Sequence, residues 1–81
     1  MKMEKIKNAL IETYRHGDYT IEITDGGDVW EAWIYNPAYG VKEYALGFSK
    51  ARHSYTEFVK AVSENAEEYA EMYREVYEDT E

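Results

Sequence analysis

The first sixteen residues carry apolar side chains at helical spacing. Met3, Ile6, Leu10 and Tyr14 recur at intervals of three and four residues, which places them on one face of a helix. The glycine that follows His16 can adopt the left-handed conformation found at helix C-termini. The pattern therefore predicts a first helix that ends near His16.

From residue 18 to residue 48 the period changes to two, and β-branched and aromatic residues become frequent. We expect three antiparallel strands, over residues 19–24, 29–35 and 41–48. Glycine and proline supply the turns between them, in the sequences Asp-Gly-Gly-Asp at 25–28 and Asn-Pro-Ala-Tyr-Gly at 36–40.

The strand predicted at 29–35 is apolar on both faces, as expected of a central strand. One face carries Trp30, Ala32 and Ile34, and the other carries Val29, Trp33 and Tyr35 together with Glu31. In the third strand, Tyr44 is expected to share a face with Leu46 and Phe48. Two helices cannot cover both sides of this sheet, so one face is expected to stay partly open. Its aromatic groups are either a contact patch or side chains that tolerate half-burial.

A second helix is predicted to begin at Ser54, because Ser54-Tyr55-Thr56-Glu57 matches the capping box. Apolar residues then recur at steps of three and four, which predicts one long amphipathic helix. The stripe consists of Tyr55, Phe58, Val59, Val62, Ala66, Tyr69, Met72, Tyr73 and Val76, and Tyr77 is expected to be exposed. The sequence leaves open a bend or a break near 63–65, where helix formers are weakest.

These elements predict a single α+β domain over residues 1–81: a helix, a three-stranded antiparallel sheet and a long C-terminal helix. The 81 residues include no cysteine, so disulfides and thiolate chemistry are excluded. No apolar run reaches the length of a signal peptide or of a membrane span. We therefore expect a soluble, cytoplasmic protein.

The negative charge is concentrated near the end of the chain. Residues 61–81 hold eight acids and one base, and so carry −7 of the net charge of −8. The helical spacing places most of these acids in a stripe opposite the apolar one. The candidate binding residues of this row are Glu64, Glu67, Glu68, Glu71, Glu75, Glu78 and Asp79. A second cluster surrounds the predicted hairpin, with Asp25, Asp28 and Glu31 as its candidates.

Two interpretations of the acidic row remain open. The row is either a solvated face that keeps a small protein soluble, or a surface that imitates the charge of a nucleic-acid backbone. In the second case its partner is a basic protein that normally binds nucleic acid. Direct binding to nucleic acid or to an anionic membrane is disfavoured by charge repulsion.

Residues for catalysis or metal binding are few. His16 and His53 lack the spacing of a metal or relay site. The sequence Asp-Gly-Gly-Asp at 25–28 lacks the alternate oxygen ligands of a calcium loop, so we expect a turn there. No phosphate-binding loop or nucleophile elbow occurs. We therefore predict a non-enzymatic protein with no metal and no cofactor.

The segment Gly17-Asp18-Tyr19-Thr20-Ile21-Glu22-Ile23 resembles the strand entry of small anti-CRISPR proteins, which inhibit the RNA-guided nuclease of type II systems. The predicted order of elements and the acidity are similar too. The resemblance implies a phage or mobile-element inhibitor whose acids replace the DNA edge that the nuclease reads with an arginine pair. The contact would come from the hairpin acids or from the helical row.

A rival interpretation is an interaction domain that self-associates. Its contact would be the open face of the sheet or a strand edge, through Trp33 and Tyr35, and the acidic helix would then serve only solubility. The sequence allows either a monomer or a homodimer.

Overall fold

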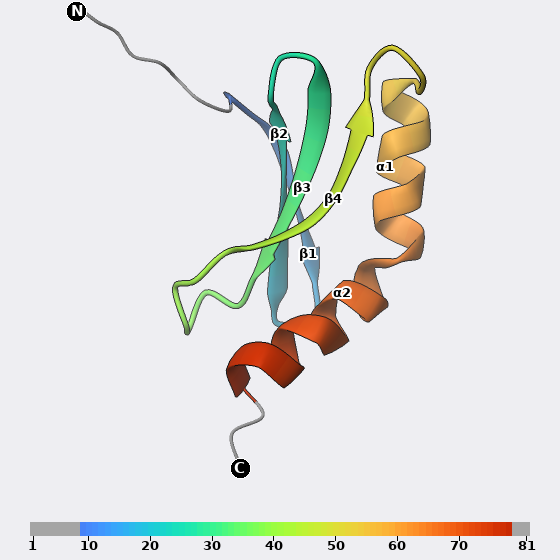
Figure 1. Ribbon diagram of the computed structural model, residues 1–81. Helices are drawn as coiled ribbons and strands as arrows, with labels where there is room; N and C mark the ends of the chain where they lie inside the picture. The colour runs from blue at the N-terminus through green and yellow to red at the C-terminus, as the bar shows by residue number, and fades with distance from the viewer. Residues whose placement is uncertain (1–8, 79–81) are drawn as a thin grey trace, which may run out of the picture.

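The computed structural model describes residues 9–78 as a four-stranded antiparallel sheet with helices packed on one face (Figure 1). The strands are β1 (Ala9–His16), β2 (Tyr19–Asp25), β3 (Val29–Tyr35) and β4 (Glu43–Ser49), and they neighbour one another in chain order. They are followed by α1 (Tyr55–Glu64), α2 (Ala66–Tyr73) and a π-helical turn, η1 (Arg74–Glu78). The predicted α+β class is confirmed.

The helix predicted up to His16 is wrong over the described residues, since 9–16 form strand β1 and the sheet has four strands instead of three. In β1 a bulge between Leu10 and Glu12 puts Leu10 on the outer face of the sheet and Tyr14 on the inner face, so the four-residue spacing does not mark one face of an element. Pairing with β2 along the whole of β1 supplies the backbone hydrogen bonds that a short helix would have made itself. The remaining positions of the pattern, Met3 and Ile6, lie outside the described residues.

Glycines close the first two hairpins. Gly17 has a φ of 60° and lies in the two-residue turn between β1 and β2, where a positive φ matches the twist of the strands. Gly27 has a φ of 97°, and its N–H donates to the Asp25 carboxylate over 2.8 Å. The turn predicted at 25–28 is therefore confirmed.

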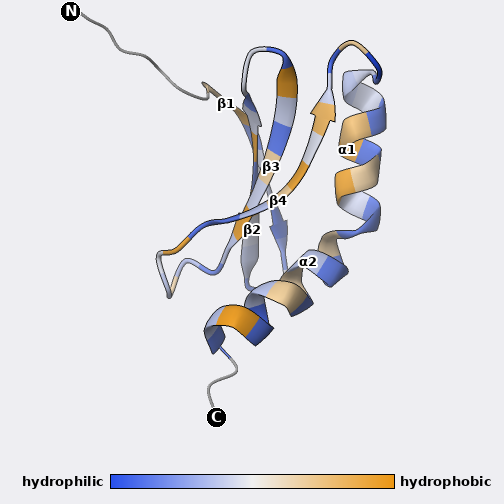
Figure 2. Cartoon of the chain, viewed as in Figure 1, coloured by the Kyte–Doolittle hydropathy of each residue, from blue (hydrophilic) through white to orange (hydrophobic). Residues whose placement is uncertain are grey.

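The core lies between the sheet and the helices. Ile21, Ile23, Ala32 and Ile34 of the inner sheet face are at most 2% exposed, and they pack with Phe58, Val62, Ala70 and Tyr73 from the helices. Figure 2 shows the hydrophobic colour of α1 concentrated on the side turned to the sheet. β3 pairs with both β2 and β4, which confirms the central strand predicted at 29–35.

A β-bulge changes which residues of β4 face the core. Ala32 pairs with Leu46, whereas the next residue, Trp33, pairs with Tyr44, so that Ala45 is an extra residue in β4. Tyr44 therefore lies on the outer face of the sheet, with its ring centroid 5.2 Å from that of Trp33. The expectation that Tyr44 shares a face with Leu46 is wrong, because a bulge shifts the period by one residue.

The capping box at the start of α1 is confirmed. Glu57 N–H donates to the Ser54 hydroxyl over 3.1 Å, and Ser54 N–H donates to the Glu57 carboxylate over 2.8 Å. The single long helix is not formed, because α1 ends at Asn65. The Asn65 side chain donates to the carbonyl of Ala61 over 2.8 Å, a bond that competes with continuation of the helix.

The π-helical turn alters the end of the apolar stripe. A π turn holds more residues than an α turn and so rotates the side chains that follow it. Val76 was expected on the buried stripe but is 59% exposed. Tyr77, expected to be exposed, instead packs on the core and donates its hydroxyl to Glu43 over 2.7 Å.

The outer face of the sheet carries no helix in the part of the chain that the structure describes. Leu10 is 57% exposed and Tyr44 is 49% exposed on this face. The protein measures 43 × 34 × 17 Å, and the thin dimension matches two layers. The expectation of one partly open sheet face is confirmed.

Candidate functional site

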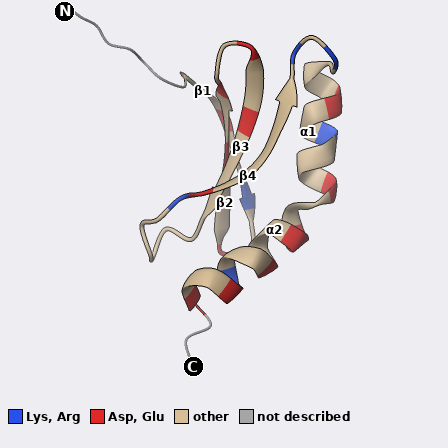
Figure 3. Ribbon diagram, in the orientation of Figure 1, with Lys and Arg blue, Asp and Glu red and all other residues tan. Residues whose placement is uncertain are grey.

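The helical layer is strongly acidic. Residues 55–78 contain seven glutamates, one lysine and one arginine, a net charge of 2 − 7 = −5. Figure 3 shows these acids spread along α1 and α2 with few basic side chains between them. This layer is the surface that most strongly favours a basic partner.

Four carboxylates of the acidic row have no partner within residues 9–78. They are exposed, and they make neither an ion pair nor a hydrogen bond with the described part of the chain. These residues are Glu64, Glu68, Glu71 and Glu75. We call them the free row. Its charges are available to another molecule.

Two other predicted site residues are held by the fold itself. Glu67 pairs with His16 over 2.8 Å and with Arg74 over 3.3 Å, and these two neighbours, His16 first, lower the pKa of the Glu67 carboxyl. Glu78 accepts hydrogen bonds from the Tyr19 hydroxyl at 2.9 Å and from the Asn36 amide at 3.0 Å. Both join the helical layer to the sheet or its loops. Asp79 lies outside the described residues.

Two members of the free row, Glu71 and Glu75, lie between two shallow hollows. A hollow of about 450 Å³ is lined by Glu71, Arg74, Glu75 and Glu78, and one of about 520 Å³ reaches from Ala45 of β4 to the same two central glutamates. Glu71 and Glu75 line both. A lysine or arginine side chain entering either hollow would therefore meet the same pair of carboxylates.

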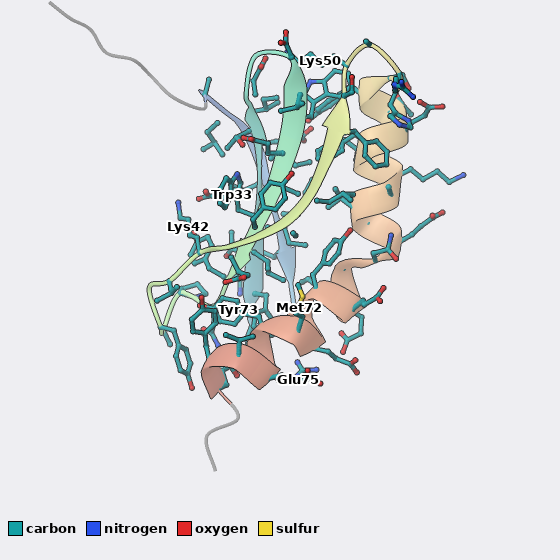
Figure 4. The ribbon with its side chains drawn as sticks, viewed as in Figure 1. Trp33, Lys42, Lys50, Met72, Tyr73 and Glu75 are labelled. Atoms are coloured by element: carbon teal, nitrogen blue, oxygen red, sulfur yellow. The ribbon has the colours of Figure 1, made fainter. Side chains whose placement is uncertain are left out.

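Exposed apolar side chains lie among these acids. Met72 is 39% exposed and Val76 is 59% exposed. Figure 4 shows Met72 and Glu75 on the same helix, α2 and its π-helical continuation. Apolar area inside a charged rim is the composition of many protein interfaces. The sequence pattern had placed both residues in the core, and no local signal reveals the π turn that exposes Val76.

The hairpin acids form a separate group in which Asp25 is paired with a base. Asp25 pairs with Lys50 over 2.8 Å, and the pKa of its carboxyl is lowered first by this lysine and then by the Gly27 N–H. Glu31 accepts a hydrogen bond from Thr24 at 3.3 Å. Asp28 is exposed on the turn. Figure 3 places this hairpin at the opposite end of the molecule from α2, so the two acidic clusters do not form one surface.

The histidines have structural partners. His16 contacts Glu67, and the His53 ring lies 4.2 Å from the Phe48 ring and 3.5 Å from the Glu57 carboxylate. Among residues 9–78, no three acidic or histidine side chains gather in a way that would hold a metal ion. None of the helices in that range has the length and apolar character needed to cross a membrane.

No protein-family model matches the chain, and neither a curated protein sequence nor a solved structure matches it. The properties of the surface are therefore argued from its own geometry.

Proposed function

We propose that this protein is a non-catalytic binding module whose free row occupies a basic surface on another protein. The observation that carries the proposal is the set of four exposed glutamates, Glu64, Glu68, Glu71 and Glu75, with no internal counter-ion among the described residues. Placing like charges together destabilises a helix, so stability does not account for this arrangement.

The basic surface is one that otherwise receives nucleic acid. Helical rise separates Glu68 and Glu71 of α2 by about 4.5 Å along the axis, which is of the same order as the roughly 3.4 Å per phosphate of one DNA strand. Met72 and Val76 add apolar contact area that a phosphate backbone lacks. Following the resemblance to anti-CRISPR proteins, the RNA-guided nuclease of a type II system is the first partner to test.

The test is a binding titration at two salt concentrations. Calorimetry of the protein with the purified, guide-loaded nuclease at about 50 mM and about 200 mM NaCl should show a loss of affinity of at least tenfold, because exposed charge pairs are screened. If that nuclease does not bind, proteins retained from a native-cell extract at low salt and eluted by salt identify the partner. Equal affinity at both salt concentrations would contradict the proposal that the free row binds by imitating the charge of nucleic acid.

Matched variants locate the contact. Glu71→Lys/Glu75→Lys and Asp18→Lys/Asp28→Lys change the net charge by the same amount, one on the helical row and the other around the first two hairpins. Only the first should abolish binding. If both double variants weaken binding equally, binding depends on net charge alone, and the free row is a solvated face that serves solubility.

A further inference from the structure

The outer face of the sheet carries a cluster of aromatic groups that the acidic row does not involve. Trp33 and Tyr44 pack edge to face, and Lys42 Nζ lies 5.3 Å from the ring centroid of Tyr35. Figure 4 shows Trp33 and Lys42 on the side of the sheet away from α1. A hollow of about 390 Å³ beside Trp33 extends to Leu10, which is 57% exposed.

The Tyr44 side chain reaches over residue 47, which has room for it because residue 47 is a glycine. A Cβ atom built on Gly47 would be 2.0 Å from the Tyr44 hydroxyl oxygen, so any larger residue displaces the ring. The Trp33 indole N–H donates to Thr24 over 3.0 Å, which holds the indole against the sheet. These two contacts fix the positions of both aromatic side chains at the centre of the outer face.

The charges of this face balance, in contrast to those of the helical layer. The pairing register puts two bases, Arg15 and Lys42, and two acids, Glu22 and Glu31, on or beside it. Their formal charges sum to zero. Glu22 and Lys42 pair over 2.8 Å within the chain. A second copy of a chain with a net charge of −8 can therefore approach this face without facing the acids of the helices.

The charges are also arranged to suit a two-fold axis. Along β3, Glu31 lies two residues before Trp33 and Tyr35 lies two residues after it, all on the outer face. A two-fold axis across the strands at Trp33 places Glu31 of one copy opposite Tyr35 of the other. Because Lys42 lies over Tyr35, Glu31 then meets the second copy's Lys42, and the same contact repeats on the other side.

We propose that two copies of this protein associate through their outer sheet faces, with Trp33 and Tyr44 at the centre and a Glu31–Lys42 pair at each end. Four strands of about seven residues give roughly 450 Å² of flat sheet per copy, from about 4.8 Å between strands and about 3.3 Å per residue. Two such faces fall below the roughly 1,200 Å² of a stable complex, so the dimer is reversible and depends on concentration. The helical layers point outward, and both free rows stay accessible.

Sedimentation velocity from about 1 µM to about 1 mM tests the proposal. The wild-type protein should shift from monomer to dimer over this range. Glu31→Lys alone and Lys42→Glu alone each place like charges opposite each other, and each should weaken association at least tenfold. An equimolar mixture of the two variants should restore it, because each then offers the charge that the other needs. A mixture no tighter than its components would overturn the proposal.

Further variants separate the interface from the fold. Tyr44→Lys and Gly47→Ala disturb the aromatic centre and should give monomers whose far-UV circular dichroism matches the wild type. Glu71→Lys, on the helical layer, should dimerise at least as well as the wild type. A wild-type protein that stays monomeric at every concentration, or a Tyr44→Lys variant that still dimerises, would also overturn the proposal. Neither result bears on the salt-dependent binding of the free row.

Discussion

At the scale of single residues, the position of a basic side chain decides what each acid does. Glu67 and Asp25 have a cation within 3.3 Å and are fixed parts of the fold. Glu71 and Glu75 have none within the described range and project into solvent. Glutamates on neighbouring turns are thus either tied to the fold or left exposed, according to whether His16 or Arg74 lies beside them.

The pair formed by Asp25 and Lys50 predicts a specific pH dependence. The pKa of Asp25 is lowered in the folded protein, so its charge stabilises the fold above the ordinary value near 3.8, and this contribution is lost as the pH falls through the lower folded value. Lys50→Met should raise the pKa of Asp25 and remove part of this acid sensitivity. NMR titration of the Asp25 carboxyl carbon measures this pKa in both proteins. Lys60→Met, which removes an exposed base on α1, should leave the pKa of Asp25 unchanged.

The members of the acidic row could be predicted from helical spacing, but their partners could not. His16 reaches Glu67 across 51 positions of the chain, and Tyr19 reaches Glu78 across 59. Such contacts depend on how the sheet and the helices pack, which spacing along one helix does not encode. The exposure of Met72 could not be predicted either, because it also depends on how the helices pack on the sheet.

At the scale of elements, local signals predicted those parts that are fixed locally. β2 follows from strict alternation, β3 follows from a run of β-branched and aromatic residues between two turn sequences, and α1 begins where its capping box lies. β1 was not predicted because the bulge at Ile11 puts Leu10 and Tyr14 on opposite faces, so that no simple period of two runs through this strand. The weak point near 63–65 does become a helix break, at Asn65.

The capping box makes a measurable prediction for α1. Ser54→Ala removes the hydroxyl that accepts the Glu57 N–H, and should lower the free energy of unfolding by about 1 kcal/mol. Ser54→Asp keeps an acceptor at that position and should stay close to the wild type. Urea unfolding followed by circular dichroism compares the three proteins. Equal losses in both variants would mean that the hydroxyl is not what stabilises the start of the helix.

At the scale of the whole molecule, the two layers differ in charge as well as in structure. The helical layer carries −5 over residues 55–78, whereas the charges of the outer sheet face cancel. Two faces with these properties, on opposite sides of a protein 17 Å thick, can be occupied at once. A dimer through the sheet would present two acidic surfaces to a larger basic partner, and this doubles the valence of the weak electrostatic contact.

Stability and binding should respond in opposite directions to one substitution in the free row. Glu71 has glutamates four residues before and after it, so Glu71→Lys replaces two unfavourable neighbours with two favourable ones and places a cation near the end of α2. The melting temperature should rise by about 2–5 °C, while affinity for the basic partner falls. Asp28→Lys, on the hairpin turn, is the control for binding and should leave it unchanged. If Glu71→Lys stabilises the protein and binding persists, the row is a solvated face; if binding is lost, the charge at position 71 is retained at a cost in stability because the partner requires it.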